Sequence, residues 1–534
     1  MATVSHPRIR PEVLEDRAYQ TAIADAATRA NTLVVLPTGL GKTAIALRVA
    51  AEYLLKAPTR SILLMAPTKP LVAQHARSVL QTLFCPPPLV LTGEISPDRR
   101  QTLLSPPQVV VATPQVIAND LSQGNFPLST FSLVIFDEAH RAVGDYPYVA
   151  IGQAVRDTDA RVLAMTASPG SKLERVQAVW ANLGIEHFEL RTASDPDVAP
   201  YIHGTQVESV EVPLPAELRQ LTVYLRSVVQ RQTEILHRLG YFPGQEAGRR
   251  ELLAVGWSLR REIAAIRQRG ETPDGRLWQA NTAQAIAMKA MHGLILAETQ
   301  GVEALRKFLG ARSATKNGRI RPSDRAFLSD PDIVELQRQL DRLELEHPKL
   351  AVAVEIVTQE IERTPSSRVI LFAHYRQTAD TLVERFSQIP NRPVRAARFV
   401  GQASHGTDTG LSQKQQIDLM DRFRRGEINC LVATSVGEEG LDIPSTDLVV
   451  FYEPVPDEVR TIQRRGRTGR FRAGRVVVLI TAGTRDVGTF LSARRKEQRM
   501  HEMLEKVEAQ SRKGPLAPPP RPTVQSTLDE LPSS

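Results

Sequence analysis

The chain has 534 residues, with 67 Lys and Arg against 59 Asp and Glu, and so carries a formal net charge of +8 at pH 7. Single hydrophobic cores stop growing at roughly 250–300 residues, so this length predicts two or three domains. The positive charge favours a polyanionic partner but is far below the charge density of a histone-like protein. Two cysteines far apart, Cys85 and Cys430, argue against a metal cluster or a disulfide and for buried thiols in a reducing compartment.

No apolar run approaches the roughly 20 residues that span a bilayer, and the N-terminus has no apolar signal core. We therefore expect a soluble, intracellular protein.

Short apolar runs rich in β-branched residues recur along the chain, separated by amphipathic segments of helical length. The first series lies at 32–36, 61–66, 108–112, 132–136 and 161–165. The second series lies at 368–373, 429–433, 447–452 and 475–480. Continuous runs of this length predict buried parallel strands. The fold class is therefore expected to be α/β, with two parallel-sheet domains.

Residues 200–345, between the two series, have apolar residues at helical spacing and almost no β-branched runs, which predicts a helical insert. Within it, the stretch 306–325 is strongly basic and is either a solvated loop or a phosphate-binding element. Its candidate phosphate contacts are Arg312, Lys316, Arg319 and Arg321. Trp257 and Trp278 also fall in the insert; packing in its core is the interpretation we favour over the stacking of a nucleic-acid base.

A P-loop is predicted at "LPTGLGKT" (36–43), which follows the first apolar run and leads into a good helix. The glycines allow backbone N–H groups to turn inward around a phosphate, the lysine reaches the β and γ oxygens, and the threonine can coordinate Mg²⁺. The pattern departs from the generic one because it begins with Leu36 instead of glycine. The residues expected to hold ATP here are Pro37, Thr38, Gly39, Leu40, Gly41, Lys42 and Thr43.

Two carboxylates end the apolar run in "LVIFDEAH" (133–140), where unpaired buried charge would be costly. A metal ion and a nucleotide would compensate for that charge. We expect Asp137 to hold Mg²⁺ and Glu138 to orient and deprotonate the attacking water. Upstream, "RAYQ" (17–20) offers Arg17 and Gln20, whose amide is suited to an adenine edge.

Nine segments occur in an order that resembles a superfamily 2 nucleic-acid helicase over most of residues 10–500. They are "RAYQ", "LPTGLGKT", "APTKPLVAQH" (66–75), "ATPQVI" (112–117), "DEAH", "MTASP" (165–169), "ILFAHYR" (370–376), "ATSVGEEGLDIP" (433–444) and "QRRGRTGR" (463–470). Longer stretches, including "DEAHRAVGDYPYVAI" and 433–470, resemble the Hef and Fanconi anaemia M-type branch. That branch has a helical insert and acts on forked and branched DNA, whereas its archaeal members continue into a nuclease domain that this sequence does not show.

The resemblance implies two RecA-like domains that clamp ATP and bind a nucleic-acid strand across their upper faces. We expect the ATP-binding domain at 1–199, the insert at 200–345, the second RecA-like domain at 346–500, and a helix end with a Pro-rich, disordered tail at 501–534. A cytoplasmic, nucleoid-associated location would follow.

The remaining motifs receive roles from the same resemblance. Thr68, Lys69 and Thr113 are candidates for contacts with the sugar-phosphate backbone. Gly440 and Asp442 lie where nucleotide and strand meet, and Thr166 and Ser168 are placed to link the Mg²⁺-bound carboxylates to the nucleic-acid face.

The four arginines of "QRRGRTGR" suggest a catalytic device rather than a DNA patch. Arg467 and Arg470 are three apart and would share a helical face, from which they can stabilise the γ-phosphate charge, with Gln463 one turn earlier.

The function expected is that of an ATP-dependent DNA helicase or translocase that remodels branched DNA. A double-stranded RNA-dependent ATPase is the main alternative, and an ATPase-dead nucleic-acid scaffold is a second. The tail segment "QSTLDEL" (525–531) loosely resembles a sliding-clamp-binding peptide through Gln525 and Leu528; its aromatic pair is missing, so a plain polar tail is favoured.

Overall fold

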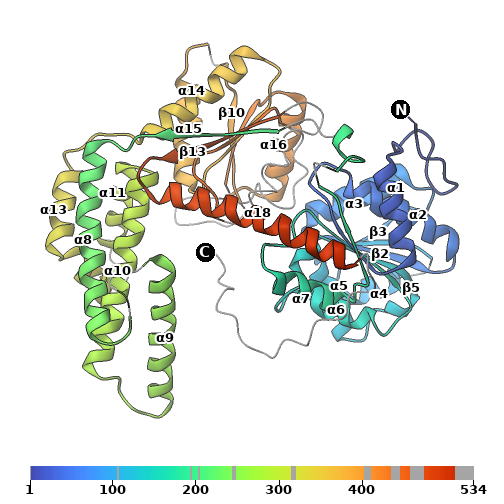
Figure 1. Cartoon of the computed structure of the whole chain (residues 1–534), viewed down its shortest axis with the longest axis horizontal. Helices are drawn as coiled ribbons and strands as arrows, with labels where there is room; N and C mark the ends of the chain where they lie inside the picture. The colour runs from blue at the N-terminus through green and yellow to red at the C-terminus, as the bar shows by residue number, and fades with distance from the viewer. Residues whose placement is uncertain are drawn as a thin grey trace.

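The structure is a computed structural model that describes residues 2–104, 107–192, 195–201, 205–242, 244, 248–313, 320–391, 393–401, 410–434, 446–456 and 474–511. Its described part contains two parallel sheets and a helical region beside the second sheet (Figure 1). None of the helices in these ranges is long and apolar enough to cross a membrane.

The first sheet has seven strands in the order β3-β4-β2-β5-β6-β1-β7, all paired in parallel. Its strands are β1 (Thr32–Val35), β2 (Ser61–Met65), β3 (Leu89–Leu91), β4 (Val109–Ala112), β5 (Phe131–Asp137), β6 (Arg161–Thr166) and β7 (His187–Leu190). The five apolar runs predicted as strands are confirmed. We did not predict β3 and β7, which are edge strands: β3 is three residues long, and β7 alternates half-buried with buried residues instead of forming an apolar run.

Helices cover both faces of this sheet. One face packs against α1 (Ala18–Arg29), α2 (Lys42–Lys56) and α3 (Lys69–Thr82). The other face packs against α5 (Pro114–Ser122), α6 (Pro147–Val155) and α7 (Leu173–Leu183). The short helix α4 (Pro97–Leu103) lies between β3 and β4 in the chain. This doubly wound arrangement brings the carboxyl ends of all seven strands to one edge, where ligands of such sheets bind.

The second sheet has the order β10-β11-β9-β12-β13-β8, again all parallel. Its strands are β8 (Thr205–Val212), β9 (Val369–Phe372), β10 (Ala396–Phe399), β11 (Cys430–Ala433), β12 (Leu448–Phe451) and β13 (Gly474–Thr481). Helices α14 (Pro348–Arg363) and α15 (Arg376–Gln388) cover one face, and α16 (Gln413–Arg425) covers the other. The four runs predicted here are confirmed.

Strand β8 corrects our expectation that residues 200–345 are helical throughout. It pairs with β13 along its whole length, from Thr205 with Gly474 to Val212 with Thr481. Polar residues separate the valines of "TQVESVEV", so no continuous apolar run marked this edge strand.

The remaining region between the sheets' sequence segments is helical. It consists of α8 (Ala216–Arg238), α9 (Arg249–Gln268), α10 (Gly275–Thr299), α11 (Val302–Ser313), α12 (Pro322–Leu328) and α13 (Pro331–Leu340). Two apolar clusters hold it together, one between α8, α9 and the first half of α10, and one around the second half of α10. Trp257 and Trp278 are not in either cluster: they are 49% and 43% exposed, so our preference for core packing was wrong.

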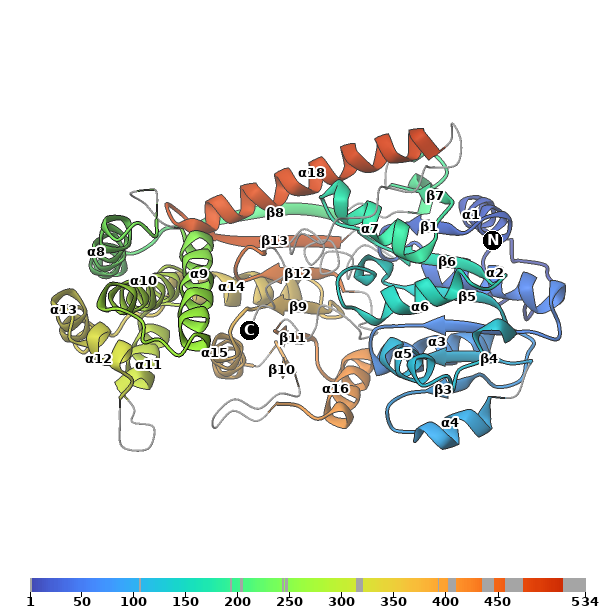
Figure 2. The ribbon, with the colours of Figure 1, turned by 90° about the horizontal axis from the view of Figure 1, so that it is seen from below.

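A long last helix, α18 (Arg485–Ser511), joins the two sheets. It begins next to β13 and runs past the edge strand β8 to the first sheet, where it lies beside β7 (Figure 2). Met500, Leu504 and Val507 are buried there in the apolar cluster of the first sheet.

Candidate active site

The P-loop connects β1 directly to α2. Gly39 and Gly41 have φ angles of 89° and 83°, a left-handed backbone that favours glycine. The turn places Lys42 and Thr43 as the first two residues of α2, so the free N–H groups and positive dipole end of that helix face the turn. The Lys42 ammonium donates a hydrogen bond to the Leu36 carbonyl at 3.2 Å. The turn has the backbone conformation that suits an anion, and its contact with phosphate stays a prediction.

Gln20 lies against this turn and is almost fully buried. Its amide Nε2 donates to the Leu40 carbonyl at 3.1 Å, and the Tyr19 hydroxyl donates to the same oxygen at 2.7 Å. A Cβ atom added to Gly41 would come within 2.5 Å of the Gln20 amide nitrogen, so a side chain here would displace that amide. Arg17 forms an ion pair with Glu15 at 2.6 Å. Gln20 is thus next to the P-loop, and its contact with adenine stays a prediction.

Asp137 is the last residue of β5 and is buried. Its Oδ2 lies 2.8 Å from Nε2 of His75 on α3, and its Oδ1 accepts the backbone N–H of Glu138 at 3.0 Å. The strand β5 lies two strands from β1 in the sheet, so Asp137 and the P-loop share the carboxyl edge. We did not predict a role for His75 from the sequence, although it closes the segment "APTKPLVAQH".

Glu138 has the left-handed backbone conformation φ 51°, ψ 49°, which is uncommon for a residue with a side chain and often marks a functional site. Burial raises its pKa, but the hydrogen bond and charge of His140 and the charges of Lys42 and Arg141 outweigh that effect and lower the pKa to about 2. The carboxylate is therefore ionised at neutral pH. The charge of Lys42, in the P-loop, thus acts on the carboxylate of the "DEAH" segment.

His140 links the acidic motif to the end of β6. Its Nδ1 lies 3.3 Å from Glu138 Oε2 and 3.1 Å from the hydroxyl of Thr166. The Thr166 hydroxyl also donates to the Ser168 carbonyl at 3.0 Å. Ser168 in turn donates from Oγ to Sδ of Met500 on α18, at 2.9 Å. A continuous set of contacts therefore runs from Glu138 to the helix that joins the two sheets.

The donor set fits a magnesium ion held partly by a nucleotide. Asp137 and Thr43 supply oxygen atoms, the ligand type that Mg²⁺ prefers, and Mg²⁺ usually takes only one or two protein carboxylates together with phosphates and water. Within the described ranges no group of three or more His, Cys, Asp or Glu side chains is arranged to hold a metal by itself. Such a site needs the phosphates of its substrate to be complete.

The candidate nucleic-acid contacts of the first domain begin helices at the same edge. Thr68 and Thr113 precede α3 and α5, which follow the neighbouring strands β2 and β4. Lys69 forms an ion pair with Glu94 at 2.8 Å. The three residues are thus brought to one edge, as we expected from the sequence, and their DNA contacts stay predictions.

The candidate phosphate contacts in the basic stretch 306–325 have different surroundings. The Arg312 guanidinium lies 3.7 Å from the centre of the Phe308 ring and donates to the Phe308 carbonyl, so it packs on its own helix. Arg321 precedes α12 and is exposed. Lys316 and Arg319 lie outside the described residues.

The predicted catalytic and nucleotide contacts of the second domain also lie outside the described residues. These are Gln463, Arg467, Arg470, Gly440 and Asp442.

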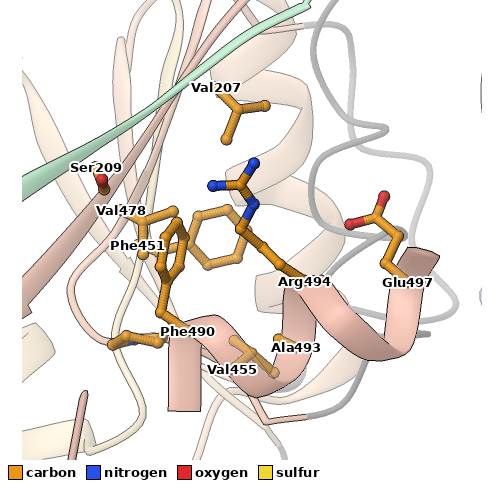
Figure 3. A pocket seen from close by; sticks show the side chains of 10 residues that line it. Val207, Ser209, Phe451, Val455, Val478, Phe490, Ala493, Arg494 and Glu497 are labelled. Atoms are coloured by element: carbon orange, nitrogen blue, oxygen red, sulfur yellow. The ribbon is translucent and has the colours of Figure 1, made fainter. Parts of the chain in front are cut away.

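A pocket of about 280 Å³ lies between β8, the end of β12 and α18 (Figure 3). Its walls combine apolar side chains, including Val207, Phe451 and Phe490, with the polar side chain of Arg494, which extends from α18 between them. Its described lining contains none of the P-loop or "DEAH" residues.

Comparison with known proteins agrees with this geometry. A DEAD/DEAH box helicase model matches residues 17–176, and a helicase conserved C-terminal domain model matches residues 351–472. The crystal structure of the Pyrococcus furiosus Hef helicase domain is 40% identical in sequence and superposes with a TM-score of 0.68. The match includes 91% of this chain and 99% of that domain.

The chain belongs to the Hef helicase family. Curated relatives include a Methanocaldococcus jannaschii protein, named provisionally as an ATP-dependent RNA helicase, that is 36% identical over 94% of this chain and 62% of its own length. An ATP-dependent DNA helicase of Neurospora crassa is 33% identical over 88% of this chain and 41% of its own. The Fanconi anemia group M protein of Gallus gallus is 32% identical over 90% of this chain and 25% of its own length. The chain thus spans between a quarter and about three fifths of these Hef-family relatives.

Proposed function

We propose that this chain is an ATP-dependent DNA helicase or translocase that acts on forked or branched DNA. The observation that carries the proposal is that the P-loop and "DEAH" residues lie at the carboxyl edge of the same sheet, where the charge of Lys42 helps to lower the pKa of Glu138. Relatives named as DNA helicases support DNA as the substrate.

Lys42 and the backbone N–H groups of the P-loop would bind the β- and γ-phosphates, with Gln20 beside the adenine. Asp137 and Thr43 would hold Mg²⁺, which neutralises phosphate charge and orients the oxygens. Glu138, which is ionised, would accept a proton from the attacking water. His75 would hold the Asp137 carboxylate in position through its Nε2 contact.

In the second domain, Arg467, Arg470 and Gln463 would face the γ-phosphate, with Gly440 and Asp442 near nucleotide and strand. Backbone contacts by Thr68, Lys69 and Thr113 would alternate with contacts of the second domain as ATP closes and hydrolysis reopens the pair. We also propose the domain limits 1–199, 200–345 and 346–500, except that β8, which falls within 200–345, belongs to the second RecA-like domain because it pairs with β13.

The test is ATP hydrolysis measured with no nucleic acid, a forked DNA, a linear DNA duplex and an RNA duplex of matched length. We expect the forked DNA to stimulate most. Stimulation chiefly by duplex RNA would favour the RNA-dependent ATPase, which the name of the M. jannaschii relative suggests. Absence of hydrolysis under all four conditions would favour the scaffold.

Clamp binding by the tail, through Gln525 and Leu528, is a separate proposal that rests on sequence alone. A clamp pull-down with the whole chain and with a chain lacking residues 521–534 tests it, and equal recovery would reject it.

A further inference from the structure

Basic and acidic residues lie on different sides of helix α9, and the proposed ATPase mechanism uses none of them. Its buried residues are Leu252, Val255, Gly256 and Leu259, which lie on one side of the helix. At about 100° per residue, five arginines and one tryptophan fall within an arc of roughly 120° that borders this buried side. They are Arg249, Arg250, Trp257, Arg260, Arg261 and Arg267, which we call the α9 flank.

The acids of α9 lie elsewhere. When angles around the helix are counted from Arg249, the α9 flank covers roughly 0–120°. Glu251 and Glu262 then lie at roughly 200–220°, at the opposite border of the buried side. A helix that only needed a solvated surface would mix the two signs of charge around its exposed side. The separation instead gives the α9 flank one sign of charge, which suits an anionic ligand.

Aromatic rings interrupt this basic surface at two places. The Arg260 guanidinium lies 5.2 Å from the centre of the Trp257 ring, and that of Arg267 lies 5.7 Å from the centre of the Trp278 ring. Both indoles are exposed, at 49% and 43%. Trp278 is near the start of α10, so it continues the α9 flank at the tip of the helical hairpin.

Spacing along the helix is compatible with a stacked strand. Arg267 lies next to Trp278, so it indicates how far along α9 that ring is. Arg267 is ten residues beyond Trp257 and therefore about 15 Å further along the helix axis at 1.5 Å per residue. Stacked bases are about 3.4 Å apart in one strand, so this distance corresponds to roughly four or five bases.

The other end of the α9 flank opens into a groove whose described lining includes four basic side chains and one acidic side chain among apolar residues. Arg249 lines a pocket of about 620 Å³ between the insert and the start of α18, together with Arg226, Arg485 and Lys496. Its one acid, Glu298, accepts hydrogen bonds from Arg226 and from the backbone N–H of Arg485. The positive surface therefore continues from the hairpin tip to the second sheet.

We propose that the α9 flank and Trp278 bind an unpaired DNA strand, with bases stacked on Trp257 and Trp278 and phosphates paired with the arginines. The proposal rests on the proposed function and specifies which part of a branched DNA the insert holds. Exposed indoles provide sequence-tolerant stacking, and arginines on the same surface provide the salt-dependent contact to the backbone. A duplex offers its bases only in the grooves, so an unpaired strand fits the two rings better.

Tryptophan fluorescence of the full chain provides the test. The sequence has three tryptophans, and the third, Trp180, is buried in the first sheet's core. We expect quenching on titration with a single-stranded oligonucleotide and much less with a blunt duplex. Trp257→Ala and Trp278→Ala should each weaken single-strand binding by between about 5-fold and about 140-fold, as stacking of about 1–3 kcal/mol per base implies.

Three further variants complete the test. Trp257→Phe should retain most of the affinity because the ring persists. Val223→Ala, at an exposed apolar position on α8 of the same insert, should change nothing. The double variant Arg260→Gln/Arg261→Gln should reduce the salt dependence of single-strand binding, by about 0.7 in the log–log slope for each phosphate that the protein no longer neutralises.

Unchanged single-strand affinity in both tryptophan variants would overturn the proposal. Equal losses for single strand and duplex would also overturn it, because the surface would then contact only the backbone. The forked-DNA ATPase assay on the unaltered chain separates the two hypotheses: if DNA stimulates it while the tryptophan variants bind normally, the proposed function stands and the stacking surface fails.

Discussion

Oγ of Ser168 lies 2.9 Å from Sδ of Met500, although the two residues are 332 positions apart in the chain. Ser168 follows β6, whose carboxyl end lies at the same sheet edge as the P-loop. Met500 belongs to α18, which starts next to the second sheet. The contact therefore connects the ATP-binding edge of the first domain with a structural extension of the second.

Replacement of Met500 by alanine should loosen α18 from the first sheet. A buried Met-to-Ala change removes transfer energy and leaves a cavity, which costs about 2–5 kcal/mol. We expect a lower temperature of unfolding and a weaker stimulation of ATP hydrolysis by DNA, with ATP affinity retained. Glu505→Ala, at an exposed position on the same helix, is the control and should behave like the unaltered chain. If Met500→Ala kept full DNA stimulation, the contact would be only structural.

Lys42 and Glu138 should give different defects. Lys42→Ala removes the phosphate-binding cation, so both ATP affinity and hydrolysis should fall. Glu138→Gln keeps the shape of the side chain but cannot accept a proton, so turnover should fall by about 10²–10⁴ while ATP binding persists. Equilibrium binding of ATP and steady-state kcat distinguish these outcomes, and near-normal kcat in both variants would refute the site assignment.

Glu453, just after β12, should make the protein less stable as pH rises. Burial raises its pKa to about 7, even though Lys349 and hydrogen bonds from the His374 N–H and the Gln300 amide oppose the rise. The Gln300 bond, at 3.2 Å, comes from the insert. The folded protein holds a proton on this group between the ordinary pKa of 4.5 and about 7, so its stabilising effect is present below pH 4.5 and is lost through pH 7.

The difference in free energy of unfolding amounts to at most about 3 kcal/mol, from 1.36 kcal/mol per pKa unit. Unfolding temperatures of the unaltered chain and Glu453→Gln, measured from pH 5.5 to 8.5, test this expectation. The variant should show a flatter pH dependence, and parallel curves would contradict the assignment.

Lys349 and Asp486 form an ion pair between α14 and the start of α18, and both are buried. Asp486 also accepts the backbone N–H of Thr481 at 3.1 Å. Lys349→Met leaves a buried charge without its partner and should cost about 3–5 kcal/mol in the free energy of unfolding. Lys349→Met combined with Asp486→Asn keeps the hydrogen bond and removes the charge, so it should recover much of that loss. Denaturant unfolding measures both, and a double variant no better than the single one would refute this explanation.

The buried strands and the phosphate-binding turn could be predicted because each depends on local sequence. A continuous apolar run specifies a central parallel strand, and two glycines before a lysine specify the turn that surrounds a phosphate. Edge strands such as β7 and β8 have no such run, because one of their faces is exposed.

Contacts between distant segments were not predictable in the same way. His75 meets Asp137 only because α3 follows β2, which lies beside β5 in the sheet order, and nothing near either residue indicates the other. The exposure of Trp257 depends likewise on which side of α9 faces α10. Its position in the helical pattern, between the arginines of α9, was the available indication.

The pairing of β8 with β13 affects where the chain can be divided into stable fragments and when the second sheet can be completed during synthesis. Strand β8 is synthesised before the insert, yet its partner β13 emerges only after the rest of the second sheet. A fragment that begins at residue 346 would leave the backbone of β13 uncovered at the sheet edge and open to association with other chains. During synthesis, β8 must remain without its partner strand until the insert and most of the second sheet have emerged, so completion of this sheet comes late and depends on both flanks of the insert.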